Sequence, residues 1–232
     1  MTIDRSKFKP TKNWVNSFHF QMTTLSWELN HFNQYIKDTG GLIKKHEDEF
    51  KKRIDEYMED DPEGRDEIID FHYDDFQMYS TFYPFMLYNS TFLGLYSFFE
   101  STLKDICSTL EKMDLSKLKL SDLARKSDDI SQMKKFLTDV IGLNLYELDN
   151  VHSQLKDYRE VRNLIVHHYS SLKPNKNGRS DDRFIINDQR LLIDEKNERF
   201  VIKDDKYITD FSKLIEEYLR IVYKSALEQL HT

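Results

Sequence analysis

Glycine and proline are scarce in this chain of 232 residues, which contains 6 Gly and 4 Pro. Average usage is about 7% Gly and about 5% Pro, so both helix-breaking residues fall well below it. A β-sandwich or barrel needs turn residues every roughly 8–12 positions, which excludes either as the main architecture. A disordered chain is also excluded, because 13% of the residues are aromatic and can build a core. The sequence therefore predicts a globular, mainly all-α protein.

Cysteines and long apolar runs are also nearly absent. The single cysteine, Cys107, excludes an internal disulfide and a cysteine-only zinc site, and fits a reducing compartment. Its neighbours Leu103 and Ile106 favour the interpretation of Cys107 as a small buried hydrophobe. Residues 1–14 lack the apolar core of a signal peptide, and no apolar run approaches the roughly 20 residues of a transmembrane helix. We expect a soluble, cytoplasmic protein without membrane association.

Positive charge is in the minority: 34 Lys and Arg stand against 41 Asp and Glu, a formal net charge of −7. Nonspecific binding of nucleic acid depends on neutralising many phosphates, and this balance argues against it. A small local basic site remains compatible with the composition.

Apolar residues recur at three- and four-residue steps along most of the chain, which is typical of amphipathic helices. The most apolar helix is expected to be the central core helix. Two irregularities are predicted: an interruption at Gly40-Gly41 and a break or kink at Pro84. The predicted helices cover residues 12–59, 65–83, 85–113 (the core helix), a short stretch within 114–126, and 129–141, 148–171 and 208–230.

The helical pattern changes before the last helix. Residues 173–179 have loop composition, 184–186 are β-like, and 191–193 can pair with 199–202 across a turn. We therefore predict a small β-hairpin insert at about 184–203. For the whole chain, we predict an N-terminal helical region at 1–84 and a helical domain with the insert at 85–232.

A group of polar residues closes the helix predicted at 148–171. Asn163 and His167 are four residues apart and share one helix face. Arg162 and His167 are five apart, so in a straight helix they diverge by roughly 140° at ~100° per residue. Either the Arg162 side chain swings back, or a second copy of the chain completes the site. This spacing favours a homodimer.

These residues resemble the signature of the HEPN superfamily of helical, metal-independent endoribonucleases. That signature is an Arg followed after four to six residues by a His, with a polar residue, often Asn, directly after the Arg; Arg162, Asn163 and His167 match it. Tyr169 resembles the Arg-x4-His-x-Tyr form of HEPN toxins that are paired with nucleotidyltransferase antitoxins, in which the Tyr can be modified by nucleotide transfer. The resemblance covers about residues 85–230, so it implies a HEPN-like helical bundle preceded by an N-terminal helical extension.

The resemblance implies a toxin or antiviral defence effector that cleaves RNA without metal or cofactor, held in check by an antitoxin or regulatory protein. A guanidinium fork binds a phosphodiester and stabilises its developing charge, and an imidazole transfers protons near neutral pH. The 2′-OH of RNA would attack, leaving a 2′,3′-cyclic phosphate and a 5′-OH, whereas DNA should be inert. In such families two protomers form one composite active site in a homodimer.

The expected roles follow from the match. Arg162 is the phosphate clamp and His167 the proton-transfer residue. Asn163 orients His167 or the substrate, or has a structural role. His168 and Tyr169 contact the substrate or belong to the core.

Further candidate residues lie outside the motif. Glu100 resembles an acidic residue that some HEPN families carry on the core helix facing the motif; it would orient Arg162 through a buried ion pair, or it is a polar edge residue. Four basic residues after the motif either track the RNA backbone or belong to a solvated loop, which Asp181 and Asp182 favour. They are Lys173, Lys176, Arg179 and Arg183.

Competing interpretations remain. Arg162 and His167 can form a solvated cation pair, which is favourable near a helix C-terminus. Arg65 and His72 also satisfy the bare HEPN pattern, and we give that match no functional weight. Residues 72–75 contain His and Asp but have no recognised metal-ligand spacing, so we predict partly exposed helix residues there.

Two further functions stay open. The chain can be a non-catalytic helical module that dimerises or binds a partner through exposed aromatic residues such as Tyr35, Tyr57 and Tyr73. Alternatively, Tyr169 is chiefly a modification acceptor, which would make the protein a regulated toxin.

Overall fold

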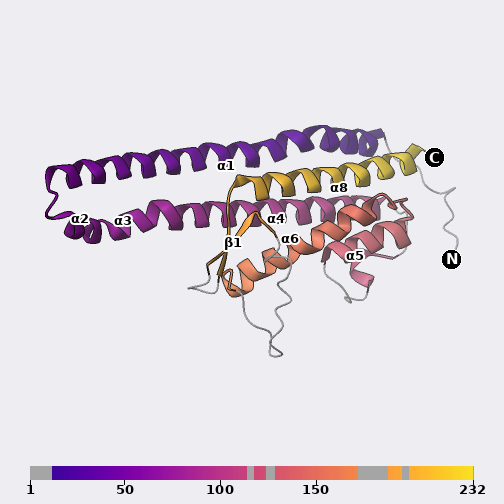
Figure 1. Cartoon of the computed structure of the whole chain (residues 1–232). Helices are drawn as coiled ribbons and strands as arrows, with labels where there is room; N and C mark the ends of the chain where they lie inside the picture. The colour runs from indigo at the N-terminus through magenta and orange to yellow at the C-terminus, as the bar shows by residue number, and fades with distance from the viewer. Residues whose placement is uncertain (1–11, 114–117, 124–128, 172–187, 195–198, 232) are drawn as a thin grey trace, which may run out of the picture. The chain divides into compact units, whose positions relative to one another are not determined.

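A computed structural model describes residues 12–113, 118–123, 129–171, 188–194 and 199–231 of the chain (Figure 1). The α-helices are α1 (Lys12–Asp60), α2 (Arg65–Phe71), α3 (Tyr73–Gln77), α4 (Tyr83–Lys112), α5 (Asp129–Lys135), α6 (Leu148–His168) and α8 (Asp205–His231). Two π-helical segments, η2 (Met78–Phe82) and η4 (Phe136–Ile141), and a 3₁₀ turn, η3 (Leu120–Asp122), complete the helical structure of the described residues. None of the helices in the described part of the chain is both long and apolar enough to cross a membrane.

The strands β1 (Leu191–Asp194) and β2 (Arg199–Ile202) pair antiparallel, with Leu191 opposite Ile202. The prediction of a mainly helical protein with a small hairpin before the last helix is therefore confirmed. The beginning of the predicted insert, residues 184–187, and its turn, 195–198, lie outside the described residues.

The fold divides into two compact units. The first takes its described residues from 12–30, 94–160 and 210–231, and the second takes the rest. Helices α1, α4, α6 and α8 each contribute residues to both units. The predicted division at residue 84 stays a prediction.

In the first unit, α4 supplies the centre of the core. Phe99 is fully buried, and its ring centroid lies 5.2 Å from that of Tyr218 on α8 in an edge-to-face contact. Phe18 of α1 makes a similar contact with Tyr223 of α8 at 5.8 Å. An apolar stripe along α4 is buried throughout, which confirms the predicted core helix. Its residues are Leu95, Tyr96, Phe99, Leu103, Ile106 and Leu110 in this unit, and Phe92 in the other.

Cys107 belongs to the same buried face of α4. Burial raises the pKa of its thiol to about 12, so it remains a neutral thiol at physiological pH. The interpretation of Cys107 as a small buried hydrophobe is confirmed.

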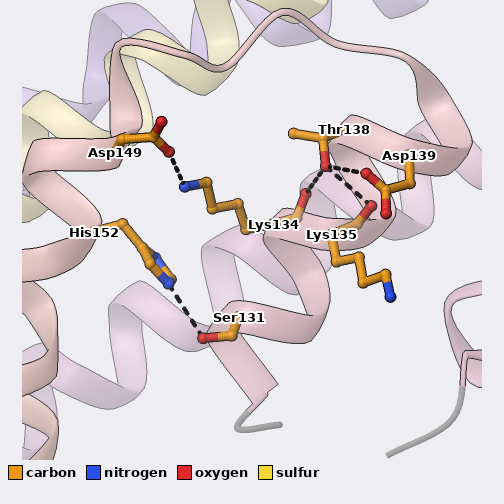
Figure 2. A network of polar contacts seen from close by, with 7 residues as sticks. All are labelled: Ser131, Lys134, Lys135, Thr138, Asp139, Asp149 and His152. Atoms are coloured by element: carbon orange, nitrogen blue, oxygen red, sulfur yellow. Dashed lines mark hydrogen bonds and ion pairs between the residues drawn. The ribbon is translucent and has the colours of Figure 1, made fainter. Parts of the chain in front are cut away.

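Polar contacts tie α5 and α6 together in the first unit (Figure 2). Lys134 Nζ lies 2.7 Å from Asp149 Oδ1, and Ser131 Oγ lies 3.1 Å from His152 Nε2. The hydrogen bond and charge of Lys134 hold the pKa of Asp149 below its usual value. From α5 the chain continues as η4 to Ile141, and the next residue, Gly142, has a left-handed φ of 83°, which is typical of a glycine that follows a helix.

The predicted interruption at Gly40-Gly41 is wrong, because α1 passes through both residues without a break. Each Gly costs a helix only about 1 kcal/mol relative to Ala. The buried side chains of Ile36 and Phe50 on either side of the pair oppose that cost. A Cβ on Gly40 would lie 3.8 Å from Leu87 of α4, an ordinary packing distance, so space does not demand glycine.

The helix predicted at 65–83 is divided in the structure. A turn at His72 separates α2 from α3, which that prediction missed. Pro84 lies in the first turn of α4, directly after the π-helical η2. Proline cannot donate the usual backbone hydrogen bond, and the wider π turn accommodates this without breaking the helix at residue 84.

Candidate functional site

The predicted motif lies at the C-terminal end of α6. Arg162 and Asn163 are half-buried, whereas His167 and His168 are exposed. All four belong to one continuous α-helix, whose apolar face is buried as predicted. The angular divergence of Arg162 and His167 expected for a regular helix therefore applies. The end of α6 thus presents one half-buried guanidinium and two accessible imidazoles.

Arg162 is hydrogen-bonded to the adjacent residue of the motif. Its Nη1 donates to Asn163 Oδ1 at 3.1 Å. We predicted that Asn163 orients His167 or the substrate, or has a structural role. The structure shows its amide oxygen accepting a hydrogen bond from the arginine, which restricts the orientation of the guanidinium. The role of Asn163 in the site stays a prediction.

The end of α6 has an unusual backbone. Tyr169 and Ser170 have φ values of 51° and 61°, two consecutive non-glycine residues in the left-handed region. Such conformations cost about 1–2 kcal/mol per residue. Hydrogen bonds hold them: Ser170 N donates to Leu164 O at 3.0 Å, and Ser171 N donates to His168 O at 2.9 Å. The α6 helix therefore stops sharply, directly after the two histidines.

Within the second unit, the hairpin and α4 hold the residues at the end of α6 in place through hydrogen bonds. Phe200 N of β2 donates to Ser170 O at 3.1 Å, and Ser171 forms a bridge with Arg199. The buried Asn89 of α4 donates from Nδ2 to Ser170 Oγ at 3.4 Å. Contacts to two other elements thus position the residues that follow the motif.

Tyr169 lies between an aromatic ring and a cation. Its ring is 52% exposed, packs edge-on against Phe85 at 5.6 Å, and lies 4.8 Å from the guanidinium carbon of Arg199. An arginine over an aromatic face is a stabilising pair. Since more than half of Tyr169 is exposed, it belongs to the surface of the site rather than to the core.

Sequence reasoning missed Arg199. Its place at the start of a predicted strand marked it only as part of the hairpin. The contact with Tyr169 depends on β2 pairing with the end of α6, which the periodicity of neither element reveals. Arg199 is an exposed cation that lies beside Tyr169 of the motif.

The remaining predicted site residues are Glu100 and the four basic residues that follow the motif. Glu100 is half-buried on α4 in the first unit, whereas Arg162 belongs to the second, and their ion pair stays a prediction. The four basic candidates of the loop lie outside the described residues: Lys173, Lys176, Arg179 and Arg183.

The residues around His72 do not extend the site. His72 is half-buried, Tyr73, Asp74 and Asp75 are exposed, and His72 Nδ1 is 3.7 Å from Asp75 Oδ2. The prediction of partly exposed helix residues is confirmed for Tyr73, Asp74 and Asp75, whereas His72 lies in the turn before α3. In the described part of the chain, His, Cys, Asp and Glu side chains form no group of three or more with metal-site geometry.

Asp188 and Arg190, just before β1, form an ion pair. Arg190 donates to Asp188 through Nε at 2.9 Å and Nη2 at 2.7 Å, and its guanidinium lies 5.1 Å from the Tyr207 ring. Partial burial tends to raise the pKa of Asp188, but the hydrogen bonds and charge of Arg190 outweigh it and lower that pKa. The pair links the start of the hairpin to the first turn of α8.

The lowered pKa of Asp188 predicts a pH dependence of stability. Because the folded pKa lies below the unfolded value of about 3.9, the stabilisation is present above that pH and is lost as pH falls through the folded pKa. We expect Asp188→Asn to lower the free energy of unfolding by about 1 kcal/mol at pH 7 and by less near pH 3. Urea titrations at the two pH values, with the exposed Asp157→Asn as control, measure this. Equal losses at both pH values would contradict it.

Comparison with known proteins does not indicate a reaction for this site. No protein family, curated protein or solved structure matches the chain. The chemistry of the site therefore has to be inferred from its own residues: Arg162 fixed by Asn163, the exposed His167, and the Tyr169–Arg199 pair that follows them.

Proposed function

We propose that this protein is a metal-independent endoribonuclease of the HEPN type, acting as a toxin or antiviral defence effector. The observation that carries the proposal is the placement of Arg162 and His167 at the end of one α-helix, with the guanidinium hydrogen-bonded by Asn163 and the imidazole exposed. Guanidinium and imidazole groups can cleave RNA without an activated water, because RNA carries its own nucleophile, the 2′-OH.

In the proposed reaction, Arg162 binds the phosphodiester through its guanidinium fork and stabilises the charge that develops on the phosphate oxygens. The 2′-oxygen forms a bond to phosphorus while the bond from phosphorus to the 5′-oxygen breaks. One imidazole takes the 2′-OH proton, and another donates a proton to the leaving 5′-oxygen. With His167 from each of two copies, one cleft would hold both the base and the acid.

The distribution of charge supports RNA as the substrate. Residues 54–77 contain eleven Asp and Glu and one Arg, so this segment has a formal charge of −10, while the whole chain has −7. The rest of the chain therefore has a formal charge of +3. The acidity that argued against nonspecific binding is concentrated in one segment, which does not include the motif.

The proposed active form is a homodimer with a composite site, restrained in the cell by an antitoxin or regulatory protein. Two copies would supply two Arg162 and two His167 to one cleft, which resolves the divergence of the pair along a single helix. The molar mass in solution, measured by light scattering, should correspond to twice 28.0 kDa. A strict monomer that still cuts RNA would contradict the composite site.

Cleavage of RNA in the presence of a chelator tests the proposal. The purified chain is incubated in EDTA with total RNA and, separately, with single-stranded and double-stranded DNA. We expect the RNA to be cut into discrete fragments and the DNA to stay intact. No cleavage of any RNA class, or cleavage that EDTA abolishes, would overturn the proposal.

Arg199 provides a prediction about substrate binding. Its guanidinium lies exposed over the Tyr169 ring, next to the motif. Replacing it with glutamine removes a cation and a stacking surface, so we expect KM for RNA to rise about 3- to 30-fold with a smaller change in kcat. Steady-state kinetics of Arg199→Gln are compared with those of the exposed Lys224→Gln. An unchanged KM would remove Arg199 from the site.

An alternative function is that of a non-catalytic module that binds a partner. It is favoured by the large apolar side chains exposed on α2, α3 and the adjoining turns, among them Phe71, which is 82% exposed. Absence of RNA cleavage together with normal growth of cells expressing the chain would favour this function over the ribonuclease.

A further inference from the structure

In the second unit, α1 ends and the short helices α2 and α3 follow it (Figure 1). Side chains of these three helices line an apolar groove. Its volume is about 320 Å³. Its apolar walls come from Phe50 and Ile54 of α1, Ile69 of α2, and Tyr73 and Phe76 of α3. Pockets that bind ligands typically measure about 300–1,000 Å³, so this groove has room for several apolar groups.

Apolar side chains around the groove are exposed to an unusual degree. Phe71 is 82% exposed, Tyr73 55%, Tyr57 50% and Ile69 44%. Single exposed apolar residues are normal, but a contiguous set next to a groove marks an interaction surface. α2 and α3 themselves contain no buried residue, so the exposed apolar side chains do not serve the core of the unit.

The groove has an acidic rim. The segment that builds it, residues 50–77, holds eleven Asp and Glu against four Lys and Arg, a formal charge of −7. Asp55 lines the groove, and Asp70, Asp74 and Asp75 are exposed on the two short helices that form its wall. Two basic residues, Lys51 and His72, also line the groove, and each lies near a carboxylate. Lys51 Nζ is 2.6 Å from Glu47 Oε1, and His72 Nδ1 is 3.7 Å from Asp75 Oδ2.

The negative charge of the rim determines which kinds of partner can occupy the apolar groove. A second copy of the chain docking through the same face would bring two segments of charge −7 together, which like-charge repulsion opposes. Nucleic acid and anionic lipid are repelled for the same reason. A basic segment with apolar anchors satisfies both the groove and its rim.

We propose that the groove formed by α1, α2 and α3 docks a basic amphipathic helix of a partner protein. Apolar side chains spaced at i, i+3 or i+4, and i+7 would enter between Phe50, Ile69 and Phe76, as in helix-in-groove recognition. Lys and Arg on the flanks of that helix would face the carboxylates of the rim. The proposal is independent of the ribonuclease function, since it uses none of the motif residues.

A designed peptide serves as the probe. It is a fluorescein-labelled 20-residue helix with Leu and Phe at i, i+3, i+4 and i+7 and Lys and Arg elsewhere. Binding to the full chain is followed by fluorescence anisotropy, next to two control peptides: one of the same composition with scrambled spacing, and one with Glu in place of Lys and Arg. We expect saturable binding of the first peptide alone, weakened by raising the salt from about 0.05 to about 0.5 M.

Variants of the chain test whether the peptide binds in the groove. Ile69→Gln and Phe76→Gln should each weaken binding of the peptide by at least about tenfold, as expected for central apolar contacts. Tyr146 is 70% exposed in the other unit, and Tyr146→Gln should leave binding unchanged. Replacing four rim carboxylates with amides should weaken binding and flatten its salt dependence: Asp55→Asn, Asp70→Asn, Asp74→Asn and Asp75→Asn. The matched control changes four exposed carboxylates of the first unit: Asp105→Asn, Glu147→Gln, Asp157→Asn and Glu217→Gln.

Specific results would show that the groove does not dock a basic helix. Circular dichroism and the melting temperature establish that each variant is folded before its binding is measured. No saturable binding, equal binding of the scrambled peptide, or unchanged binding by the Ile69 and Phe76 variants would overturn the proposal. Self-association of the chain that Ile69→Gln abolishes would overturn it in favour of a second copy as the occupant.

Discussion

Replacing His167 with alanine is expected to lower the rate of RNA cleavage by about 10²–10⁴-fold, the usual contribution of a general acid or base. His167 is exposed at the end of α6, so the substitution removes the imidazole without opening a cavity. Growth of cells expressing this variant should recover in parallel. The measurement is cleavage of total RNA in EDTA by wild type and variant at equal concentration.

Two substitutions of Arg162 separate the contribution of its positive charge to RNA cleavage from that of its planar guanidinium. Arg162→Ala should lower cleavage by about 10²–10³-fold, as for loss of a group that stabilises transition-state charge. Arg162→Lys keeps the charge but loses the planar fork and its bond to Asn163, so it should recover only part of the activity.

The control for both residues is His46→Ala, which changes an exposed histidine of α1 that is remote in sequence from the motif. It should cut RNA as wild type does. If His167→Ala or Arg162→Ala cuts as fast as this control, the assignment of the site is wrong, even if the chain proves to be a ribonuclease.

Replacing Phe99 with alanine is expected to cost about 3–5 kcal/mol in the free energy of unfolding, the range for removing a buried phenylalanine. Phe99 is fully buried and packs edge-to-face on Tyr218, so the cavity would open at the contact between α4 and α8 in the first unit. Because whole domains are stable by only about 5–15 kcal/mol, this loss is large. Equilibrium urea unfolding followed by circular dichroism measures it.

An exposed aromatic residue provides the comparison for Phe99. Tyr146 is 70% exposed in the same unit, and Tyr146→Ala should change stability by no more than about 0.5 kcal/mol. A loss below about 1 kcal/mol for Phe99→Ala would contradict the placement of α4 at the centre of the core.

Apolar periodicity predicted most of the fold because burial depends on it. The stripe on α4 and the apolar face of α6 could be read directly, since each repeats every three or four residues over several turns. The errors arose where local propensity and packing disagree: Gly40-Gly41 stays helical within α1, and α2 stops at His72 without a glycine or proline to mark it.

The candidate site was predictable only in part. Arg162, Asn163 and His167 are contiguous enough in sequence to be recognised as one group. Arg199 could not be found, because its contact with Tyr169 requires β2 to pair with residues after α6. The left-handed backbone of Tyr169 and Ser170 also leaves no signal, since neither residue is the glycine or asparagine that such a conformation favours.

The chemistry of the cut ends tests the proposed activity most directly. An RNA that the chain cleaves at a mapped position is compared, in EDTA, with the same RNA carrying a single 2′-deoxy substitution on the 5′ side of that bond. Attack by the 2′-OH predicts 2′,3′-cyclic phosphate and 5′-OH ends from the first RNA and no cut at that bond in the second. Ends carrying a 5′-phosphate, or equal cleavage of the 2′-deoxy substrate, would contradict it.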